Sequence, residues 1–457
     1  MRERSDSQET FGSQETRVPE GQPTPQALAP DVAALRLHQT AWARVPVSRR
    51  LQILRRFRKR LLLDIPGMLA LIPDHAPIDV MMAEILPMIS AIRFLEKEAT
   101  SLLKDAPLSM LGRPIWLWGV RSHINRRPLG VVLIIAPGNY PLMLAGIQAL
   151  QALAAGNTVA LKPAPGRTAL LTHFVSLLTQ AGLPQGVIHI LPEDAGPKAV
   201  QEAFDLIVLT GSEETGKKVA LAAAQNLTPT IMELSGADPV FVLPSANLSL
   251  VARALHFGLT LKHGSTCIAP RRVFVHGNHR EALEAQLALL LKNSGASHQK
   301  HYPALDQLTH TVGQAGGAVR KLGAATILLL DADQAGLADV DLFAPWLALI
   351  GVSDMAEAIE IESRSRHALG ASIFGEEKEA RALAKQIPAG SVTINDLIAP
   401  TADPRLPFGG ARASGYGMTR GREGLLSMTR AVSVSTRRSG ALHLLHYARI
   451  LHGKFSR

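Results

Sequence analysis

The chain contains a single cysteine, Cys267, and three polar residues upstream of it could complete a thiol-based active site. Asn139 lies in the segment PGNYP, Lys162 in LKP, and Glu233 in MELSG. A sulfur nucleophile that attacks a carbonyl needs a hydrogen-bond donor for the oxyanion and a base that activates water. The amide of Asn139 and the carboxylate of Glu233 are candidates for these two roles.

Each of these residues has a simpler explanation when it is taken alone. A lone cysteine is more often a small buried apolar side chain than a nucleophile, and an asparagine after a strand is more often a helix cap. A glutamate or a lysine at the end of a strand is usually solvated. The four residues fall along one regular pattern of strands and helices, however, and we therefore treat them as one set.

The elements that would position this set alternate between residues 131 and 234. The predicted strands are 131–135, 158–162, 187–191, 206–210 and 230–234, and the helices between them are 140–155, 168–181, a short helix near 198–203, and 213–226. Short apolar strands separated by helices predict right-handed crossovers and a parallel, doubly wound sheet.

Ligands of such a sheet bind at the carboxyl ends of its strands. The polar candidates all fall at or just after predicted strand ends: Asn139, Lys162, Gly211, Ser212 and Glu233. This clustering indicates a single site at one edge of the sheet.

A second α/β region follows, so the predicted fold class is α/β, with two doubly wound, Rossmann-like domains and a small β element. Residues 32–235 form the first domain and 236–425 the second, which contains Cys267, a strand at 272–276 and a helix at 280–292. Residues 1–31 are polar and predict a disordered arm. Residues 107–128 suggest a hairpin, and residues 426–457 hold a late strand at 431–435 and an amphipathic tail.

The composition fits a globular protein and argues against several functions. The 457 residues are 47% hydrophobic and 19% charged, which suits two or three domains. One cysteine cannot form an internal disulfide framework, so we expect a reducing, cytoplasmic compartment. The formal net charge is +10 and aromatic residues make up 4%. Without a nucleic-acid motif, this charge predicts no nucleic-acid partner.

One basic stretch and one uncharged stretch are explained by the fold alone. The arginines and lysines between residues 49 and 60 fall on one predicted helix, and we assign them to its solvated face. The uncharged stretch 128–161 is interrupted by Pro137, Gly138, Asn139 and Pro141, so neither half is long enough to span a membrane. We predict no metal site.

The segment GSEETGKK, residues 211–218, nearly matches a phosphate-binding P-loop. That loop needs serine or threonine after its lysine to bind magnesium, and Lys218 stands there instead. The dinucleotide fingerprint G-x-G-x-x-G is also absent after the first strand. Two interpretations stay open: Gly211 and Ser212 open a helix whose amino end holds a pyrophosphate, or they form a structural turn only.

Taken together, the motifs resemble those of the aldehyde dehydrogenase superfamily over about residues 32–436. The matching segments, in order, are RPLGVV (127–132), PGNYP (137–141), AAGNTV (154–159), LKP (161–163), AGLP (181–184), TGS (210–212), ELSG (233–236), Cys267 and PFGG (407–410). The order and spacing of so many short motifs make the resemblance highly specific.

The resemblance implies an NAD(P)-binding domain at 32–235, a catalytic domain at 236–425, and a role for each candidate. By resemblance, Cys267 attacks the aldehyde carbon, Asn139 and the Cys267 backbone N–H hold the oxyanion, and Glu233 activates the water that hydrolyses the thioester. The implied cofactor is NAD or NADP. Its contacts would come from Gly211 and four further residues: Lys162 at a ribose hydroxyl, Ser212 at the pyrophosphate, Asp341 at the nicotinamide ribose, and Phe343 beside the nicotinamide.

Some positions depart from the family pattern. Asp341 stands where the family usually has glutamate, which would loosen the hold on the ribose, and Ala344 replaces a glycine. Pro165 replaces the glutamate that NAD-preferring members often use to bind the adenosine ribose, and Arg167 lies close by in sequence. We therefore expect NADP to be tolerated beside NAD. The stretch between Cys267 and Phe343 is also shorter than usual.

Partners and substrate follow from the same resemblance. The hairpin 107–128 and the strand 431–435 are expected to form subunit contacts in a homo-dimer or tetramer. The tail, residues 441–452, is apolar on one face and basic on the other, so it either contacts a membrane surface or packs on a subunit. The segment SGYGMTRG (414–421) is similar to bacterial relatives of long apolar or carotenoid-type aldehydes, which favours an apolar substrate.

Three other functions stay open. A thioester-forming acyl reductase would use the same thiol, although Glu233 favours hydrolysis. A non-catalytic scaffold could keep the fold, and a P-loop nucleotide hydrolase is weakened by Lys218.

Overall fold

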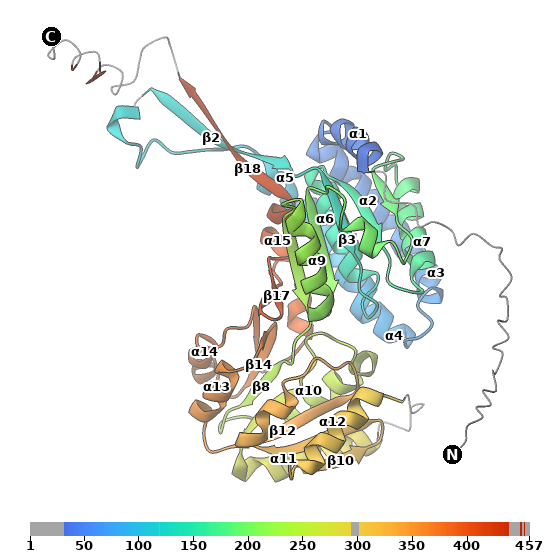
Figure 1. The fold of residues 1–457 in the computed structure, drawn as a ribbon, viewed down its shortest axis with the longest axis vertical. Coiled ribbons are helices and arrows are strands. Elements are labelled where there is room, and N and C mark those ends of the chain that lie inside the picture. The colour runs from blue at the N-terminus through green and yellow to red at the C-terminus, as the bar shows by residue number, and fades with distance from the viewer. Residues whose placement is uncertain (1–31, 118, 294–300, 438–447, 450–451, 453–457) are drawn as a thin grey trace, which may run out of the picture.

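The computed structural model describes residues 32–117, 119–293, 301–437, 448–449 and 452. Within them the chain forms two α/β bodies, each built around its own sheet, and a three-stranded sheet that projects from the first body as an arm (Figure 1). The predicted N-terminal arm, 1–31, and almost all of the predicted amphipathic tail lie outside the described residues.

The first sheet has the strand order β17-β7-β6-β3-β4-β5. Five of its strands are parallel, and they alternate with helices as the sequence predicts: β3 (Val131–Ile135), α6 (Met143–Ala155), β4 (Thr158–Lys162), α7 (Thr168–Gln180), β5 (Ile188–Ile190), α8 (Gly196–Ala199), β6 (Leu206–Gly211), α9 (Glu213–Gln225) and β7 (Thr230–Leu234). From β3 the chain builds outward through β4 and β5, then returns to add β6 and β7 on the other side. The carboxyl ends of β3 and β6 therefore flank the point where strand order reverses, which is where ligands bind to such sheets.

N-terminal helices surround this sheet: residues 47–103 pack against α6 and α7 on one face, and Leu35 packs against the other face. These helices are α1 (Val32–Ala43), α2 (Val47–Leu63), α3 (Ile65–Ala70), α4 (Pro77–Val80), the π-helical turn η1 (Met81–Ile85) and α5 (Leu86–Leu103). Phe57 of α2 meets Phe174 of α7 edge to face at 5.2 Å. The prediction that the basic residues of α2 are all solvated is wrong for Arg50, which is 6% exposed. Burial lowers the pKa of Arg50 to about 10.

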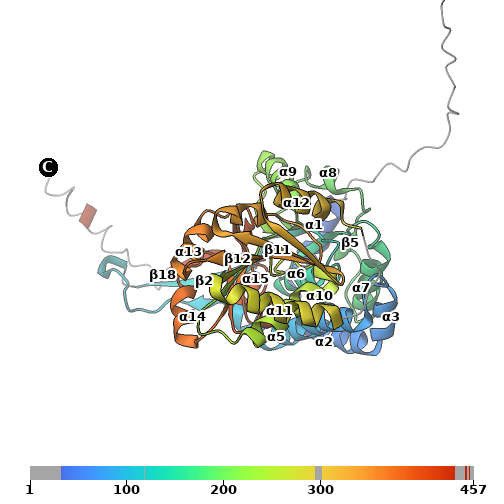
Figure 2. The ribbon, with the colours of Figure 1, turned by 90° about the horizontal axis from the view of Figure 1, so that it is seen from below.

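The second sheet has the order β10-β11-β12-β9-β8-β14-β15, with only β10 antiparallel. Its strands are β8 (Pro239–Val242), β9 (Arg272–His276), β10 (Ala318–Leu322), β11 (Ala325–Asp331), β12 (Trp346–Val352), β14 (Gly370–Phe374) and β15 (Ser391–Ile394). Helices α10 (Leu248–Thr260) and α11 (Gly277–Asn293) cover one face. Helices α12 (Pro303–Gln314), α13 (Met355–Ser363) and α14 (Glu377–Ala384) cover the other, so the sheet is enclosed on both sides (Figure 2).

Short elements connect these layers. They are the 3-10 turns η3 (Leu261–Gly264), η4 (Ala332–Ala338) and η5 (Ala399–Ala402), and the two-residue strands β13 (His367–Ala368) and β16 (Ala411–Arg412), which pair antiparallel. No helix among the described residues is long and apolar enough to cross a membrane.

The arm consists of β1 (Ala106–Pro107), β2 (Val120–Pro128) and β18 (Thr429–Arg437), with the turn η2 (Ile115–Leu117) between the first two. β18 pairs with β2 along the full length of both strands, from Thr429 opposite Pro128 to Arg437 opposite Val120. After Thr429, every residue of β18 is exposed or only half-buried. The arm extends away from both bodies (Figure 1).

The chain returns to the first body before it enters β18. The two-residue strand β17 (Gly415–Tyr416) pairs antiparallel with β7, and α15 (Gly421–Ser427) packs beside α5 and α6. The sequence range 236–425 assigns both elements to the second domain, and a two-residue strand in a glycine-rich segment gives no periodicity that could have placed it. Gly415 has φ +97°, and a Cβ there would lie 2.0 Å from the carbonyl oxygen of Met232, so only glycine fits.

Candidate active site

Cys267 lies on a tight loop after α10. The chain reverses through three consecutive left-handed residues: Lys262 (φ 48°), His263 (φ 56°) and Gly264 (φ 68°). The buried guanidinium of Arg271 donates hydrogen bonds to the carbonyl oxygens of Gly264 (2.6 Å), Ala344 (2.8 Å) and Trp346 (2.9 Å). These contacts fix the loop to β12, so the thiol is presented from a rigid support.

Two cavities meet at this cysteine. The first, of about 370 Å³, lies at the carboxyl ends of β3, β6 and β7, and we call it the strand-end cavity. The second, of about 250 Å³, is lined mostly by aliphatic and aromatic side chains, and we call it the apolar cavity. Leu144, Glu233 and Cys267 line both. A reaction at the sulfur could therefore draw one reactant from each side.

The strand-end cavity gathers most of the residues that the sequence singles out. Seven of the predicted site residues line it: Asn139, Gly211, Ser212, Glu233, Cys267, Asp341 and Phe343. Lys162 does not line it, although it ends β4, the strand next to β3. Cys267, Asp341 and Phe343 come from the second body and the others from the first, so the cavity is built by both.

Asn139 is oriented by two hydrogen bonds. Its side-chain Nδ2 donates to the carbonyl oxygen of Ser265 at 3.0 Å, and its Oδ1 accepts from the backbone N–H of Tyr140 at 3.0 Å. An amide nitrogen carries two hydrogens, so one remains for an oxyanion. The hydroxyls of Tyr140 and Thr266 are hydrogen-bonded at 2.8 Å, which adds a second link to residues 261–267. We call this segment the nucleophile loop, after the role expected for Cys267.

A buried ion pair supports this arrangement from behind. Lys262 Nζ lies 2.7 Å from Glu84 Oε1, both side chains are fully buried, and the same Nζ donates to the carbonyl oxygen of Asn139. Glu84 Oε2 accepts from the backbone N–H groups of Leu142 (3.3 Å) and Met143 (2.7 Å) at the start of α6. The pair thus joins the loop before Cys267 to the loop that carries Asn139.

Glu233 is a buried carboxyl with one oxygen free. It is 2% exposed, its Oε2 accepts from the hydroxyl of Thr419 at 2.7 Å, and its Oε1 has no hydrogen-bond partner among the described residues. Burial raises the pKa of Glu233, while the Arg420 charge and the Thr419 hydroxyl oppose the rise. Such a group is a stronger base than an exposed glutamate and suits proton transfer near neutral pH.

The thiol of Cys267 is held in its protonated form when the site is empty. Burial raises its pKa far above the ordinary range, and the nearby carboxyls of Glu233 and Asp238 raise it further. Arg420 acts in the opposite direction. Activation of the nucleophile therefore depends on positive charge brought near the sulfur.

Several residues of the strand-end cavity are suited to binding a dinucleotide. Gly211 has no side chain to obstruct a ligand, and Ser212 caps α9 by accepting from the backbone N–H of Thr215 at 3.3 Å. The N-terminus of this 13-residue helix therefore faces the cavity with its positive end. Asp341 is held by the Ser235 hydroxyl, and the ring of Phe343 is 37% exposed at the rim.

The P-loop alternative has little support from this geometry. Its two lysines pair along the exposed surface of α9, Lys217 with Glu213 and Lys218 with Glu214, each at 2.6 Å. Neither lysine lines the strand-end cavity.

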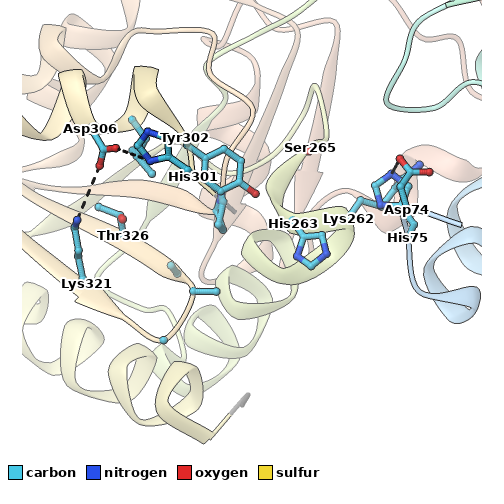
Figure 3. Close-up of a pocket in the computed structure, with 15 residues that line it drawn as sticks. Asp74, His75, Lys262, His263, Ser265, His301, Tyr302, Asp306, Lys321 and Thr326 are labelled. Atoms are coloured by element: carbon cyan, nitrogen blue, oxygen red, sulfur yellow. Dashed lines mark ion pairs between the residues drawn. The ribbon is translucent and has the colours of Figure 1, made fainter. Parts of the chain in front are cut away.

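A third and larger cavity, of about 530 Å³, lies behind the nucleophile loop (Figure 3). His263 and Ser265 line it from the loop, and on its other side Asp306 of α12 forms ion pairs with His301 and Lys321. Neither Cys267 nor Glu233 lines this cavity, so it is separate from the candidate active site.

Four residues of the site are not predicted as site residues from the sequence. Thr419 and Arg420 come from the glycine-rich segment before α15, and Glu84 and Lys262 come from helix ends. The one available signal for Lys262 is its position five residues before the only cysteine.

The chain resembles known proteins over nearly all of its length. The model of the aldehyde dehydrogenase family matches residues 14–302 and 310–434. The 4,4'-diapolycopene aldehyde oxidase of Methylomonas sp. is 30% identical over 87% of this chain and 79% of its own length. The chain belongs to the aldehyde dehydrogenase family.

Other comparisons agree with this family. The 4,4'-diaponeurosporen-aldehyde dehydrogenase of Staphylococcus aureus is 30% identical over 75% of this aldehyde dehydrogenase and 79% of its own length. The NAD+ complex of an aldehyde dehydrogenase from Bacillus cereus shares the fold, with a TM-score of 0.80 and 23% identity over 89% of this chain and 88% of that one. The sequence-based predictions of the family, the α/β fold class and an NAD(P)-dependent dehydrogenase are confirmed.

Proposed function

We propose that this aldehyde dehydrogenase oxidises a long or otherwise apolar aldehyde to the carboxylic acid, with Cys267 as nucleophile, Asn139 as oxyanion donor and Glu233 as the base that activates water. The single observation that carries the proposal is the meeting of two cavities at Cys267 and Glu233. One cavity has the strand-end position expected for a dinucleotide, and the other has the apolar lining expected for the aldehyde.

The first steps use the nucleophile loop and the Asn139 loop. The Cys267 thiol loses its proton to solvent, the sulfur forms a bond to the aldehyde carbon, and the carbonyl electron pair moves to oxygen. The free hydrogen of the Asn139 amide and the Cys267 backbone N–H stabilise that oxyanion. A nicotinamide cofactor bound in the strand-end cavity, near Ser212, Asp341 and Phe343, would supply the hydride acceptor needed to oxidise this adduct to a thioester.

Glu233 acts in the second half of the reaction. Its unpartnered Oε1 takes a proton from water, the resulting hydroxide adds to the thioester carbonyl, and the sulfur leaves as a thiolate. Thr419 holds the other oxygen, which keeps the free oxygen turned toward the cavities. An acyl reductase that passes its thioester to another acceptor has no need of this base, so the placement of Glu233 favours hydrolysis.

The apolar cavity supports an apolar substrate. Three large side chains at its lining are well exposed to solvent: Ile78 (66%), Met82 (57%) and Phe257 (42%). Exposed apolar residues around an opening are typical of binding sites for apolar ligands. Two of the relatives reported above are named for carotenoid-type aldehydes, which agrees with this lining.

An aldehyde panel tests the substrate class. We expect kcat/KM to rise with chain length from a four-carbon to a twelve-carbon aldehyde by at least about tenfold, because each buried methylene adds up to ~0.8 kcal/mol. Met82→Ser, at the exposed end of the cavity, should reduce that slope, while Leu221→Ser, at an exposed leucine on α9, should not. A preference for a small polar aldehyde would contradict the proposal.

Two groups near the end of β4 bear on the choice between NAD and NADP. Arg167, which the sequence offers to the 2′-phosphate of NADP, is paired with Asp74 through both guanidinium nitrogens, at 2.5 and 3.0 Å. Glu193 occupies the N-terminus of α7, where it accepts from the backbone N–H groups of Gly166, Arg167 and Thr168. The Thr168 hydroxyl and these N–H groups lower the pKa of Glu193 to about 2, so it is ionised.

A phosphate near the end of β4 would therefore meet a carboxylate in the helix position that otherwise binds anions. We expect NAD to bind at least about 100-fold more tightly than NADP, because this fixed negative charge disfavours a second anion. Glu193→Gln should reduce the ratio of the two Kd values at least about fivefold, and Asp194→Asn should leave it unchanged within about twofold. Equal wild-type affinities, measured by fluorescence titration, would refute this expectation.

We also propose that the arm formed by β2 and β18 mediates a homo-dimer or tetramer. Its strands are exposed and extend beyond both bodies, which leaves backbone groups free to pair with another chain. The single cysteine supports a cytoplasmic location. A peripheral membrane contact through the tail stays a prediction, because the tail lies outside the described residues.

A further inference from the structure

One basic residue lies in the apolar cavity. Of the described residues that line it, only Arg420 carries a positive charge, while Asp79 and Glu233 carry the negative ones. Arg420 is 8% exposed, although it lies at the start of α15. A cation removed from water at this depth needs a compensating interaction.

The contacts of Arg420 hold it in place without neutralising it. Nη1 donates to the carbonyl oxygen of Thr401 at 2.9 Å, and the guanidinium lies over the ring of Phe408 at 4.0 Å. Its Nε is buried without a hydrogen-bond partner among the described residues. The positive charge is therefore left for the cavity.

The other buried cations near the thiol have partners of their own: Arg272 pairs with Glu362 at 2.8 Å, and Arg271 donates to the carbonyl oxygens of Gly264, Ala344 and Trp346. Lys262 pairs with Glu84 at 2.7 Å, so the two contribute almost no net charge. The remaining groups that act on Cys267 are Glu233 of β7, Asp238 before β8, and Arg420, with the phenol of Tyr140 close by. Among these, Arg420 alone favours a negative sulfur.

We propose that the Arg420 guanidinium is the counter-charge that allows the Cys267 thiolate and the Glu233 carboxylate to exist together in a cavity of low dielectric. This inference rests on the proposed function, since it uses the roles given there to both residues. Without Arg420, two negative groups would share a buried site with no positive partner, and one of them would stay protonated.

Electrostatic directions at each group agree with this assignment. The Arg420 charge is the first influence that lowers the pKa of Glu233 against its burial, and together with a backbone hydrogen bond at Cys267 it lowers the pKa of that thiol against burial and two carboxyls. In return, Glu233 and then Cys267 raise the pKa of Arg420 against its own burial. Arg420 is thus a positioning residue: it acts on the reaction through the ionisation of Glu233 and Cys267.

Alkylation of the thiol tests the proposal directly. Cys267 is the only cysteine, so the rate of its reaction with iodoacetamide, in which the S–C bond forms and iodide leaves, reports the thiolate fraction at each pH. We expect Arg420→Met to move the midpoint of the rate–pH profile upward by at least about one unit, which is a tenfold slower reaction below the midpoint. Arg420→Lys keeps the charge and should restore most of the rate.

Matched variants separate charge from structure. Arg422→Met removes an exposed arginine two residues further along and should leave the profile unchanged. Phe408→Leu removes the stacking ring but keeps the cation, so its profile should stay near that of the wild type. If Arg420→Met does not fold, Arg420→Gln keeps a donor for Thr401 while removing the charge and should show the same upward shift.

Two outcomes would overturn the inference. Profiles of Arg420→Met and Arg420→Gln that coincide with the wild type would show that the charge does not act on the sulfur, and so would a shift that Arg420→Lys fails to reverse. Alkylation requires no aldehyde turnover, so a protein that oxidises no aldehyde but shows the shift would contradict the proposed function and leave this inference standing.

Discussion

Replacement of Cys267 by alanine is expected to abolish aldehyde-dependent NAD(P)H formation, with a loss of at least about 1,000-fold in kcat, or ~4 kcal/mol. The reaction proposed here begins with a bond to this sulfur, and the chain has no second thiol to replace it. Absorbance at 340 nm with an apolar aldehyde and saturating NAD measures the effect.

The fold should survive this change. The loop is held by the contacts of Arg271 to three carbonyl oxygens rather than by the sulfur, so we expect Tm to stay within about 3 °C of the wild type. Cofactor binding should also be retained, because the remaining residues of the strand-end cavity are unchanged. A Cys267→Ala protein that kept more than about 1% of the activity would assign the nucleophile elsewhere.

Replacement of Glu233 by glutamine should separate the two halves of the reaction. The thioester should still form, so a rapid burst of about one NADH per site is expected, followed by a steady-state rate reduced by at least about 100-fold because no base activates water. Stopped-flow absorbance at 340 nm resolves the burst, and mass spectrometry should detect the acyl group on Cys267.

The same variant should also change how the steady-state rate depends on pH. The pKa of Glu233 is raised by burial, so in the wild type the base form, and with it the deacylation rate, increases as the pH rises through that raised value. The acidic limb of the steady-state profile should disappear in Glu233→Gln. Glu423→Gln, an exposed glutamate of α15, serves as the control and should keep the limb.

The contribution of Glu233 to folding stability should change with pH in the opposite direction to the rate. The folded protein binds the Glu233 proton more tightly than the unfolded chain does, so its contribution to stability is present at low pH and is lost as the pH rises through the folded pKa. Glutamine cannot ionise and escapes this loss. The Tm of Glu233→Gln should therefore equal or exceed that of the wild type at pH 8. In the kinetic experiment, an unchanged steady-state rate with no burst would contradict the role of Glu233 as base.

The parallel strands were predictable because their signal is local. Strands β3, β4, β7 and β9 have the bounds that their apolar runs predict. Such runs are buried on both faces of a parallel sheet and end at polar residues, so composition alone marks them. Asn139, Lys162 and Glu233 could be placed at strand ends for the same reason.

The remaining parts of the site depend on contacts between distant segments. The sequence predicts that a helix starts at Tyr140, but α6 starts at Met143, because Glu84 accepts hydrogen bonds from the backbone at its first turn. Before Cys267, α10 ends at Thr260 and Lys262 turns inward with a positive φ. Nothing near these residues in the sequence indicates that Glu84 is the partner, because it lies 58 and 59 positions from Leu142 and Met143 and 178 positions from Lys262.

The Lys262–Glu84 pair also constrains how the enzyme exchanges its reactants. The pair bridges the two bodies close to Cys267. Separating the bodies would leave Lys262 and Glu84 unpaired in a buried environment, at a cost of several kcal/mol. A clamshell motion is therefore an unfavourable way to load the enzyme. With the cofactor in one cavity and the aldehyde in the other, as proposed above, the acid product and the reduced cofactor would leave through different openings and independently of each other.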